Sequence, residues 1–474
     1  MTIEVKTNDG RTTQISAEAL EGFRGGLRGH LCLPGDAGYD EARTIWNAMI
    51  DRHPAAIVRA ASAADVMRTV RLASEHALLL AVRGGGHNIA GNAACEGGLM
   101  LDLSLMRSIR VDPAARTARV EPGARLADVD RETQAFGLAT PTGINSTTGI
   151  SGLTLGGGFG WLSRKLGLTI DNLLSADVVT SKGELLRASA SANSDLFWAI
   201  RGGGGNFGVV TSFEYQLHPV GPQVIAGLIV HPFAQAEEVL AGYRKAVAQA
   251  PDEMCCWVVM RKAPPLPFLA PEVHGKEVVV LALCYSGDPA SADKAIAPFK
   301  TIGNPIAVAI GEQPFAGWQT AFDPLLTPGE RNYWKSHDFV ELQDGLVGVM
   351  LDAVRTLPSP ACEIFIAQLG GAINRVAADA TAYPHRNVEF IMNVHVRWSD
   401  KSDDAKCIAW GRQVYDATAP FATGGVYVNF MPEDESQRVR SGAYGPNFAR
   451  LAQLKAKYDP TNLFRLNQNV APAK

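Results

Sequence analysis

The sequence predicts an α+β protein in which one α+β unit is inserted into another. Short apolar segments of strand length alternate with segments of helical periodicity along most of the 474 residues. All runs of three or more glycines precede Pro219, and the composition changes around Pro219 and Pro222. Because 474 residues exceed what one hydrophobic core usually holds, two units are expected.

The first unit is expected to contain a βαβ pattern in residues 53–104. A strand at 55–59 precedes a helix that starts at Ser62 and buries Val66 and Val70 on one face. The other elements expected before the boundary are strands at 78–82 and 99–103, a helix at 126–136, a hairpin formed by 176–181 and 184–190, a helix at 192–202 and a strand at 209–217.

Beyond the boundary, strands and helices alternate again up to about residue 429. The chain then ends in a segment whose helix stops near Asp459 and Pro460. The middle of the chain is therefore expected to form the inserted unit. Its clearest elements are strands at 224–233, 276–286, 362–369 and 388–398 and a helix at 236–250.

Composition and charge argue against several classes of function. The 44 Lys and Arg residues are matched by 48 Asp and Glu residues, giving a net charge of −4, so no nucleic-acid partner is expected. No apolar stretch reaches the roughly 18 to 20 residues that cross a bilayer, and the start MTIEVKTNDGRTTQ lacks a signal pattern. A cytoplasmic protein without a membrane partner is expected. The 7 cysteines form no CxxC pair, so neither a disulfide framework nor a metal site is expected.

Glycine clusters are the main functional signal. Gly203, Gly205 and Gly208 match GxGxxG, but a predicted helix precedes them and a strand follows, the reverse of a dinucleotide-binding fold. Backbone N–H groups exposed by such clusters bind anions without side-chain charge. We therefore predict a pyrophosphate held by several loops rather than NAD bound in the usual way. The clusters are RGGGHNIAG (83–91), SGLTLGGGFGW (151–161) and RGGGGNFG (201–208).

His87 ends the triplet of the first cluster. Tight turns alone would explain one isolated cluster, but three clusters beside strand ends favour a ligand site. A neutral imidazole can attack an electron-poor methyl carbon such as that of a flavin, and the neighbouring glycines let a flat ring approach closely. We predict that His87 is a covalent tether at one end of the cofactor while the glycines hold its pyrophosphate.

Five motifs occur in order: RGGGHNIAGN, GGLMLDLS, TGISGLTLGGGFGWLSRKLGLTIDNLLSADVVTSKGELL, DLFWAIRGGGGNFGVVTSFEY and YDPTNLFRLNQN. Together they resemble the berberine-bridge-enzyme-like branch of the vanillyl-alcohol-oxidase / p-cresol-methylhydroxylase (PCMH) superfamily, from Tyr39 onward. The resemblance implies an α+β fold with a split FAD-binding domain of the PCMH type. Residues 1–218 and 426–474 would form that domain, and residues 219–425 would form an inserted α+β substrate-binding domain.

The same resemblance implies FAD bound through a single covalent link to His87. Many family members carry a second, cysteinyl link in GxCPTxG, but GINSTTG (143–149) has Asn145 in place of that cysteine. Leu153 also replaces a histidine that commonly follows. The other implied cofactor contacts are Arg83, Gly84, Gly85, Gly86, Asn88, Gly91, Asn92, Thr142, Gly143, Thr147, Thr148, Gly149, Gly152, Leu153, Gly158, Trp161, Gly208, Val209, Val210, Asn429, Asn467 and Asn469.

Thr148 stands at the family's oxygen-gatekeeper position, where a valine-sized residue accompanies oxidase activity. The implied function is an oxidase that takes hydride from a C–OH or C–N centre of a small organic molecule to flavin N5. O2 would be the final acceptor, giving H2O2. Two alternatives stay open, a dehydrogenase of the same fold with another acceptor and a flavin-binding protein without redox turnover. The sequence leaves the substrate and the oligomeric state open as well.

Four residues are candidates for handling the substrate proton. Tyr427 belongs to YVNF, which resembles the family's YxNY, but Phe430 in its last position cannot accept a proton. Strand alternation directs Glu363 to one face of its strand and puts Asn393 and His395 together on one face of another. His395 has the most suitable intrinsic pKa for proton transfer. Tyr427, Asn393, His395 and Glu363 are therefore the catalytic candidates.

Overall fold

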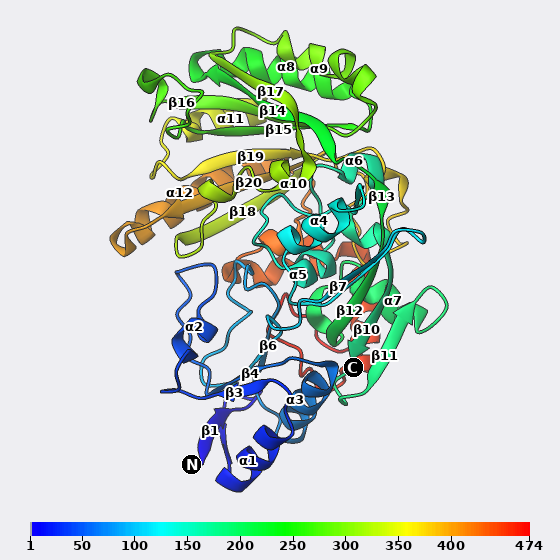
Figure 1. The fold of residues 1–474 in the computed structure, drawn as a ribbon. Coiled ribbons are helices and arrows are strands. Elements are labelled where there is room, and N and C mark those ends of the chain that lie inside the picture. The colour runs from blue at the N-terminus through cyan, green and yellow to red at the C-terminus, as the bar shows by residue number, and fades with distance from the viewer. Residues whose placement is uncertain (1) are drawn as a thin grey trace.

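The computed structural model describes residues 2–474, which form two stacked halves (Figure 1). Both chain ends lie in the lower half of that view, and the middle of the chain builds the upper half. The lower half starts with a hairpin of β1 (Ile3–Lys6) and β2 (Thr12–Ile15), followed by helix α1 (Ala17–Gly25). The mixed helices and sheets confirm the predicted α+β class.

A four-stranded sheet in the order β3-β4-β6-β5 follows, and it contains the predicted βαβ pattern. The strands β4 and β5 both pair with β6 in parallel. Ser62 caps α3 by accepting a hydrogen bond from the backbone N–H of Asp65, and α3 buries Val66 and Val70 as expected. The elements are β3 (His30–Cys32), α2 (Tyr39–Arg43), β4 (Ala56–Arg59), α3 (Ala63–Glu75), β5 (Leu80–Arg83) and β6 (Leu99–Asp102).

A five-stranded sheet in the order β11-β10-β12-β8-β7 completes the lower half. The predicted hairpin is β10 with β11, and helix α7 precedes the third glycine cluster while β12 follows it, as predicted. The elements are β7 (Ile109–Asp112), β8 (Thr117–Val120), α4 (Leu126–Gln134), β9 (Leu138–Ala139), α5 (Ile150–Leu155), α6 (Ser163–Leu166), β10 (Leu173–Val179), β11 (Leu185–Ser189), α7 (Ser194–Ile200) and β12 (Val209–Gln216).

The upper half is a seven-stranded antiparallel sheet in the order β17-β14-β16-β15-β19-β20-β18. The core that β14, β15, β16, β18, β19 and β20 share with α8, α9, α11 and α12 lies on one sheet face. The opposite face packs towards the lower half. The elements are β13 (His218–Pro219), β14 (Gln223–Pro232), α8 (Ala236–Ala248), β15 (Met254–Lys262), β16 (Glu277–Tyr285), α9 (Ala292–Lys300), β17 (Ala307–Pro314), α10 (Phe315–Gln319), β18 (Arg331–Phe339), α11 (Asp344–Val354), β19 (Glu363–Gln368), β20 (Phe390–Trp398) and α12 (Asp404–Thr418).

The C-terminal helix α13 (Phe448–Tyr458) returns to the lower half and shares its core. Lys455, fully buried, forms an ion pair of 2.7 Å with Asp459 and donates hydrogen bonds to the backbone oxygens of Asn206 and Phe464. The Asn206 side chain in turn accepts the backbone N–H of Val470. The tail is therefore joined to the third glycine cluster. The division at residues 218 and 425 stays a prediction.

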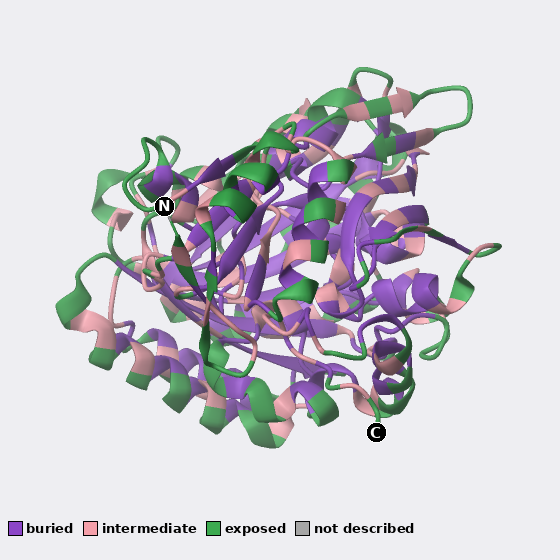
Figure 2. Cartoon of the chain, turned by 90° about the horizontal axis from the view of Figure 1, so that it is seen from below, coloured by how far each residue is buried: buried purple, intermediate pink, exposed green. Residues whose placement is uncertain are grey.

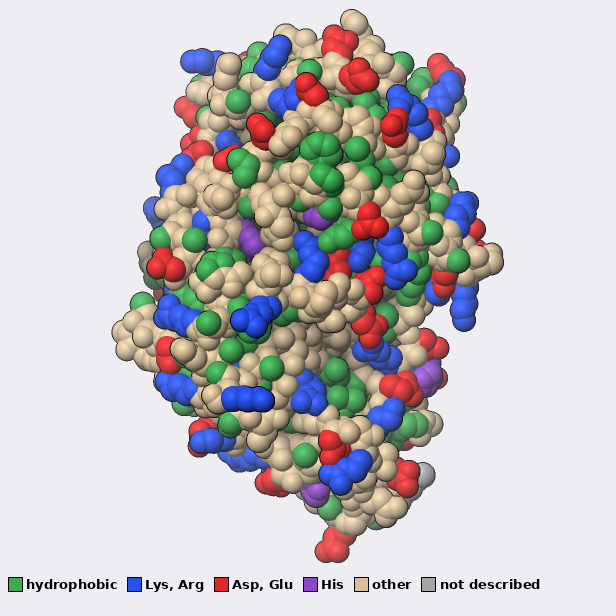
Figure 3. All heavy atoms as spheres, turned by 180° about the vertical axis from the view of Figure 1, so that it is seen from behind, with side chains coloured by type: hydrophobic (Ala, Val, Ile, Leu, Met, Phe, Trp, Pro, Cys, Tyr) green, Lys and Arg blue, Asp and Glu red, His purple; other side chains and the backbone are tan. Residues whose placement is uncertain are grey.

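Seen from below, buried residues concentrate in the interior of the molecule, while exposed residues mark the outward turns of helices at its rim (Figure 2). On the face shown in Figure 3, acidic and basic side chains are interspersed. Across residues 2–474, no helix combines the length and apolar character needed to cross a bilayer. Over the same residues, no group of three metal-ligating side chains could hold an ion. The predicted cytoplasmic location and lack of a nucleic-acid partner stay predictions.

Candidate active site

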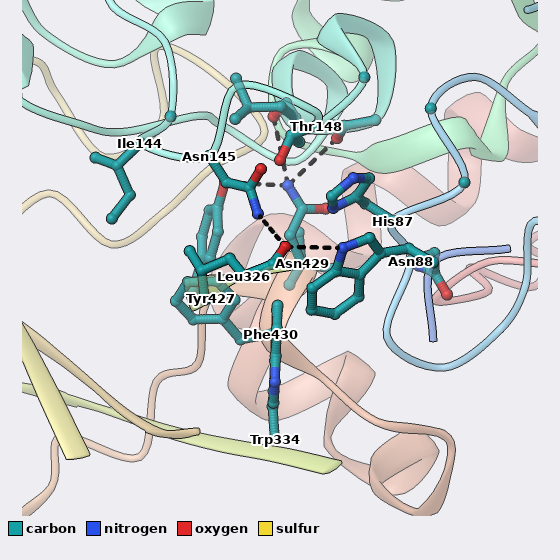
Figure 4. Close-up of a pocket in the computed structure, with 18 of the residues that line it drawn as sticks. His87, Asn88, Ile144, Asn145, Thr148, Leu326, Trp334, Tyr427, Asn429 and Phe430 are labelled. Atoms are coloured by element: carbon teal, nitrogen blue, oxygen red, sulfur yellow. Dashed lines mark hydrogen bonds between the residues drawn. The ribbon is translucent and has the colours of Figure 1, made fainter. Parts of the chain in front are cut away.

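A cavity of about 370 Å³ lies where the three glycine clusters meet the inner face of the upper sheet. Its size falls within the range of small-molecule sites. Figure 4 shows part of its lining: His87, Asn145 and Thr148 lie together, opposite Tyr427, Phe430 and Trp334. Segments far apart in the sequence therefore enclose one space.

The first glycine cluster packs through bare backbone against Gly149, which lies just before the second cluster. A Cβ atom on Gly85 would lie 2.3 Å from the backbone nitrogen of Gly149, and one on Gly149 would lie 2.4 Å from that of Gly85. By contrast, a Cβ on Gly152 or Gly205 would meet nothing within 4 Å, although both glycines line the cavity. Some glycines thus allow the loops to touch, and others leave open space for a ligand against the backbone.

Substituting Gly85 tests this packing. We expect Gly85→Ala to lower the free energy of unfolding by about 1–3 kcal/mol, because the methyl group would overlap the Gly149 backbone, which cannot rotate away. Gly22→Ala is the matched control: the added methyl in helix α1 has open space and should stabilise the protein by about 0.5–1 kcal/mol. Thermal and urea unfolding measure both changes, and equal stability of Gly85→Ala and wild type would contradict the packing argument.

Most of the predicted cofactor contacts line this cavity, and six do not. Those outside the lining are Arg83, Gly91, Thr142, Thr147, Gly158 and Asn469. Those that line it are Gly84, Gly85, Gly86, His87, Asn88, Asn92, Gly143, Thr148, Gly149, Gly152, Leu153, Trp161, Gly208, Val209, Val210, Asn429 and Asn467.

Several of these six residues lie behind the lining and support it through hydrogen bonds. The Gly158 backbone N–H donates a hydrogen bond of 3.1 Å to the Tyr427 hydroxyl. Thr142 Oγ1 accepts a hydrogen bond of 2.9 Å from Gln319, which lies outside the lining and also donates to the backbone oxygen of the lining residue Gly143 at 3.1 Å. Thr147 Oγ1 lies 3.0 Å from His87 Nε2. The sequence pattern could not separate these supporting positions from the lining, because both kinds lie in the same loops.

His87 lies in the loop after β5 and faces the cavity. Its ring stacks on Trp46, with centroids 5.0 Å apart and planes 21° apart. Withdrawal from bulk water lowers the pKa of His87 to about 3; the charge of Arg125 adds to this, and the nearby Thr147 backbone partly opposes it. The imidazole is therefore neutral at physiological pH, as a nucleophile must be.

Asn145 is fixed beside His87 by three hydrogen bonds. Its Oδ1 accepts the backbone N–H of Thr147 at 3.1 Å and the Thr147 hydroxyl at 2.7 Å. Its Nδ2 donates to the backbone oxygen of Leu326 at 3.5 Å (Figure 4). The same oxygen accepts the indole N–H of Trp46 at 3.3 Å. Asn145 thus links the loop before the second glycine cluster to the aromatic ring that supports His87.

Tyr427 is a poor candidate for a base. Its hydroxyl oxygen accepts hydrogen bonds from the Gly158 backbone and, at 3.0 Å, from the Asn429 side chain. Burial raises the pKa of Tyr427 to about 12, and those two hydrogen bonds only partly oppose the rise. The phenol therefore keeps its proton at neutral pH and holds Asn429 and the Gly158 turn in place.

Glu363 and His395 form a buried pair on neighbouring strands. They lie directly opposite each other in the β19–β20 register, and Glu363 Oε1 is 3.1 Å from His395 Nδ1. The other carboxylate oxygen accepts a hydrogen bond of 2.7 Å from Arg261. Burial alone would raise the pKa of Glu363, but Arg261 and then His395 outweigh it and lower the pKa to about 2. Glu363 is therefore an anion that accepts the Nδ1 proton of His395.

Unsatisfied polar atoms collect at this end of the cavity. Nε2 of His395 and both amide atoms of Asn393 are buried and have no hydrogen-bond partner among residues 2–474. Both residues line the cavity, and Trp334 meets the His395 ring edge-to-face at 4.6 Å. Because native proteins rarely leave buried polar atoms without partners, these atoms indicate where a ligand would bind.

Aromatic rings and one cation of the cavity escaped prediction from the sequence. Trp46 follows a short helix, and no local pattern indicates that it reaches His87. Arg261 lies in β15, a strand that was not singled out. Other unpredicted lining residues are Phe159, Trp257, Phe322, Leu326, Trp334, Phe365 and Tyr444. Trp257, Trp334 and Phe365 come from three different strands, and the other aromatic residues come from loops, so no local pattern connects them.

Comparison with known proteins agrees with this architecture. Residues 54–189 match the model of the FAD binding domain family, and residues 426–471 match the family described as berberine and berberine like. An FAD-linked oxidoreductase of Dictyostelium discoideum is 35% identical over 90% of this chain and 91% of its own. The (R)-6-hydroxynicotine oxidase of Paenarthrobacter nicotinovorans is 28% identical over 94% of this chain and 97% of its own.

Solved structures show the same fold. The crystal structure of 6-hydroxy-D-nicotine oxidase from Arthrobacter nicotinovorans superimposes with a TM-score of 0.85 at 28% identity, over 94% of this chain and 98% of that one. Physcomitrella patens BBE-like 1 gives a TM-score of 0.85 at 26% identity, over 96% and 99% of the two chains. These matches confirm the predicted PCMH-type fold and the oxidoreductase class. This chain belongs to the berberine-bridge-enzyme-like family of FAD-linked oxidoreductases.

Proposed function

We propose that this enzyme is an oxidase of a small organic molecule. It removes a hydride and a proton from a C–OH or C–N centre and passes the electrons to O2, which leaves as H2O2. The proposal rests on the hydrogen-bonded residues Arg261, Glu363 and His395. Nε2 of His395 has no hydrogen-bond partner among the described residues, and the ring lines the same cavity as His87 and the glycine clusters.

In the proposed reaction, His395 is the base. Glu363 accepts the proton on Nδ1, so the lone pair of the neutral ring is on Nε2. Nε2 is buried and has no partner among the described residues, so a substrate O–H or N–H can donate to it. When Nε2 takes that proton, the carboxylate of Glu363 stabilises the imidazolium. The amide of Asn393, with both its polar atoms free, would orient the substrate.

The residues present fit FAD. Gly152 and Gly205 leave open space against the backbone, and Asn467 lines the cavity with a buried Oδ1 that has no partner among residues 2–474. Backbone N–H groups of the clusters would hold the pyrophosphate. When bound, FAD supplies the acceptor for the substrate's hydride. His87 would bind it covalently, and Asn145 has no sulfur for a second bond.

Thr148 supports an oxidase rather than a dehydrogenase. It lines the cavity close to Asn145, and its valine-like size leaves the space that a larger side chain would fill. Its backbone oxygen accepts the N–H of Leu126 at 2.9 Å, so the residue is anchored by its main chain. A small side chain here leaves room for dioxygen.

Three measurements on the purified protein test the proposal. We expect yellow colour to stay with the wild-type chain after acid precipitation and to be released from His87→Ala. Alcohols and amines added without air should include compounds that bleach the flavin band, and readmitted air should restore the colour with stoichiometric H2O2. Bleaching without peroxide would indicate a dehydrogenase. Flavin that no candidate bleaches would favour a binding protein, and release of all colour from wild type would refute the covalent link.

A further inference from the structure

We propose that Asn145 and Thr147 form a hydrogen-bond relay that keeps the proton of His87 on Nε2 and so leaves Nδ1 as the nitrogen that bonds the cofactor. The inference rests on the proposed attachment through His87 and adds the residues that direct it. The three residues are joined in sequence by contacts of 2.7 Å and 3.0 Å.

The first step is the orientation of the Asn145 amide. The backbone N–H of Thr147, 3.1 Å away, can only donate, so the atom facing it must be the amide oxygen. The backbone oxygen of Leu326 can only accept, and it faces the amide nitrogen at 3.5 Å. Two main-chain groups of fixed chemistry therefore set which end of the amide faces Thr147.

The second step is the direction of the Thr147 hydroxyl. The amide oxygen of Asn145 carries no proton, so at 2.7 Å the hydroxyl must donate to it. A threonine hydroxyl has only one proton. Its oxygen can therefore only accept in its other contact, the one of 3.0 Å with His87 Nε2. It follows that Nε2 is protonated and donates to Thr147.

The third step concerns the other ring nitrogen. A neutral imidazole with its proton on Nε2 has its lone pair on Nδ1. Among residues 2–474, no group hydrogen-bonds Nδ1 of His87, and the ring is held in one plane by its stacking on Trp46. The relay thus presents one defined nucleophilic atom, whereas an unrestrained imidazole would divide its proton between both nitrogens.

The covalent attachment of the flavin to Nδ1 conserves atoms and electrons. A bond forms between His87 Nδ1 and the 8α-methyl carbon of the flavin, and one C–H bond of that methyl group breaks. The ring becomes cationic and then loses its Nε2 proton. The flavin takes up the electron pair together with two protons, one from the methyl group and one from the imidazole. Dioxygen then reoxidises it and leaves as H2O2. Thr147 Oγ1 accepts the Nε2–H while the ring is cationic, and this hydrogen bond lowers the free energy of the cationic ring.

Thr147→Val is the direct test, because it keeps the shape of the side chain and removes the oxygen. We expect the rate at which flavin becomes acid-stable to fall about tenfold, since the tautomer preference and the acceptor are both lost. Thr147→Ser is the matched control and should retain the wild-type rate. The readout is the covalent share of bound flavin over time after FAD is added to protein made under riboflavin limitation, with total binding measured separately.

A double variant separates the relay from a merely structural role. In Asn145→Leu the Thr147 hydroxyl loses its acceptor and can turn to donate to His87 Nε2. The ring proton then lies on Nδ1, and a protonated Nδ1 cannot attack the cofactor. Removing that donor as well, in Asn145→Leu with Thr147→Val, should therefore partly restore attachment. Asn145→Asp keeps the acceptor and should stay close to wild type. If the double variant is slower than Asn145→Leu alone, the relay is overturned.

The bonded nitrogen gives an independent readout. Digestion of the wild-type holoenzyme and NMR of the flavinyl peptide should show the bond at Nδ1, and a bond at Nε2 would overturn the relay. Release of all flavin from wild type in acid would overturn the proposed attachment itself. Wild-type retention together with an unchanged rate in Thr147→Val would leave the attachment intact and refute only the relay.

Discussion

Replacing His395 by alanine is expected to slow the reduction of bound flavin by substrate about 10²–10⁴-fold, the usual contribution of a general base. The flavin itself should remain bound and covalently attached, because His395 lies on β20 of the upper sheet and makes no contact with His87. Rapid mixing without air, followed at the flavin band, measures the reduction step alone.

The expectation follows from comparing the titratable groups of the cavity. Tyr427, with a pKa raised to about 12, is protonated at neutral pH and cannot act as a base. Glu363, with a pKa lowered to about 2, is an anion of very low basicity paired with Arg261. Burial lowers the pKa of His395 below its usual 6.5, while Glu363 opposes the shift. Of these three groups, His395 is the one that is a neutral, unprotonated base near neutral pH, and Glu363 stabilises its protonated form.

His231 provides a matched control for the loss of a buried histidine. It is fully buried in β14 of the same sheet, but it does not line the cavity. His231→Ala should therefore lower stability without a comparable effect on flavin reduction. Added imidazole should partly restore the reduction rate of His395→Ala, because the missing ring leaves space in the cavity. A folded His395→Ala variant that reduces its flavin at the wild-type rate would refute the assignment.

Local patterns in the sequence predicted several elements close to their observed bounds but not their arrangement. The helix at 126–136 is found at Leu126–Gln134, and the strand at 388–398 is found at Phe390–Trp398. Alternation also correctly separated the two faces of these strands: Glu363 and His395 line the cavity, whereas their neighbours Ile364 and Val394 lie in the core on the other sheet face. What could not be predicted is the register that puts the two opposite each other, because it depends on pairing between distant strands.

Glycines of the first and third clusters and residues of the second line the cavity, and the structure adds a second reason for one of these glycines. The sequence pattern suggested that all of them free backbone N–H groups for an anion. Gly85 of the first cluster is instead required because a Cβ atom there would overlap the backbone of Gly149, which lies just before the second cluster. This contact joins loops 64 residues apart along the chain (149 − 85). The local sequence around either glycine therefore could not predict it.

In both histidines of the cavity a hydrogen-bond acceptor fixes the tautomer, but the proton is held on opposite ring nitrogens. His87 donates from Nε2 to Thr147, which leaves Nδ1 free, and His395 donates from Nδ1 to Glu363, which leaves Nε2 free. In each case the acceptor selects the tautomer and therefore the reactive atom. The anionic acceptor beside His395 also stabilises a ring that becomes charged in every turnover, whereas the neutral hydroxyl beside His87 serves a single event.

Glu363→Gln tests this tautomer control through the pH dependence of flavin reduction. Reduction requires neutral His395, so its rate rises with pH through the pKa of that group, and the acid limb lies below pH 6.5. Glu363 raises that pKa, and without its charge the limb should move to lower pH. Arg261 should hold the glutamine oxygen and turn the amide NH₂ to Nδ1, which shifts the ring proton to Nε2 and lowers the maximal rate about 10²-fold or more.

A purely structural role for Glu363 predicts a different result. Loss of packing alone would reduce the amount of folded enzyme but would leave the acid limb of the remaining activity where it was. Glu363→Asp, which keeps the negative charge, should keep the limb close to its wild-type position even if the shorter side chain slows the reaction. An unshifted limb in Glu363→Gln would therefore show that the carboxylate does not act through His395. Removing a charge 3.1 Å from Nδ1 must change the pKa of the imidazole ring if the pair is coupled.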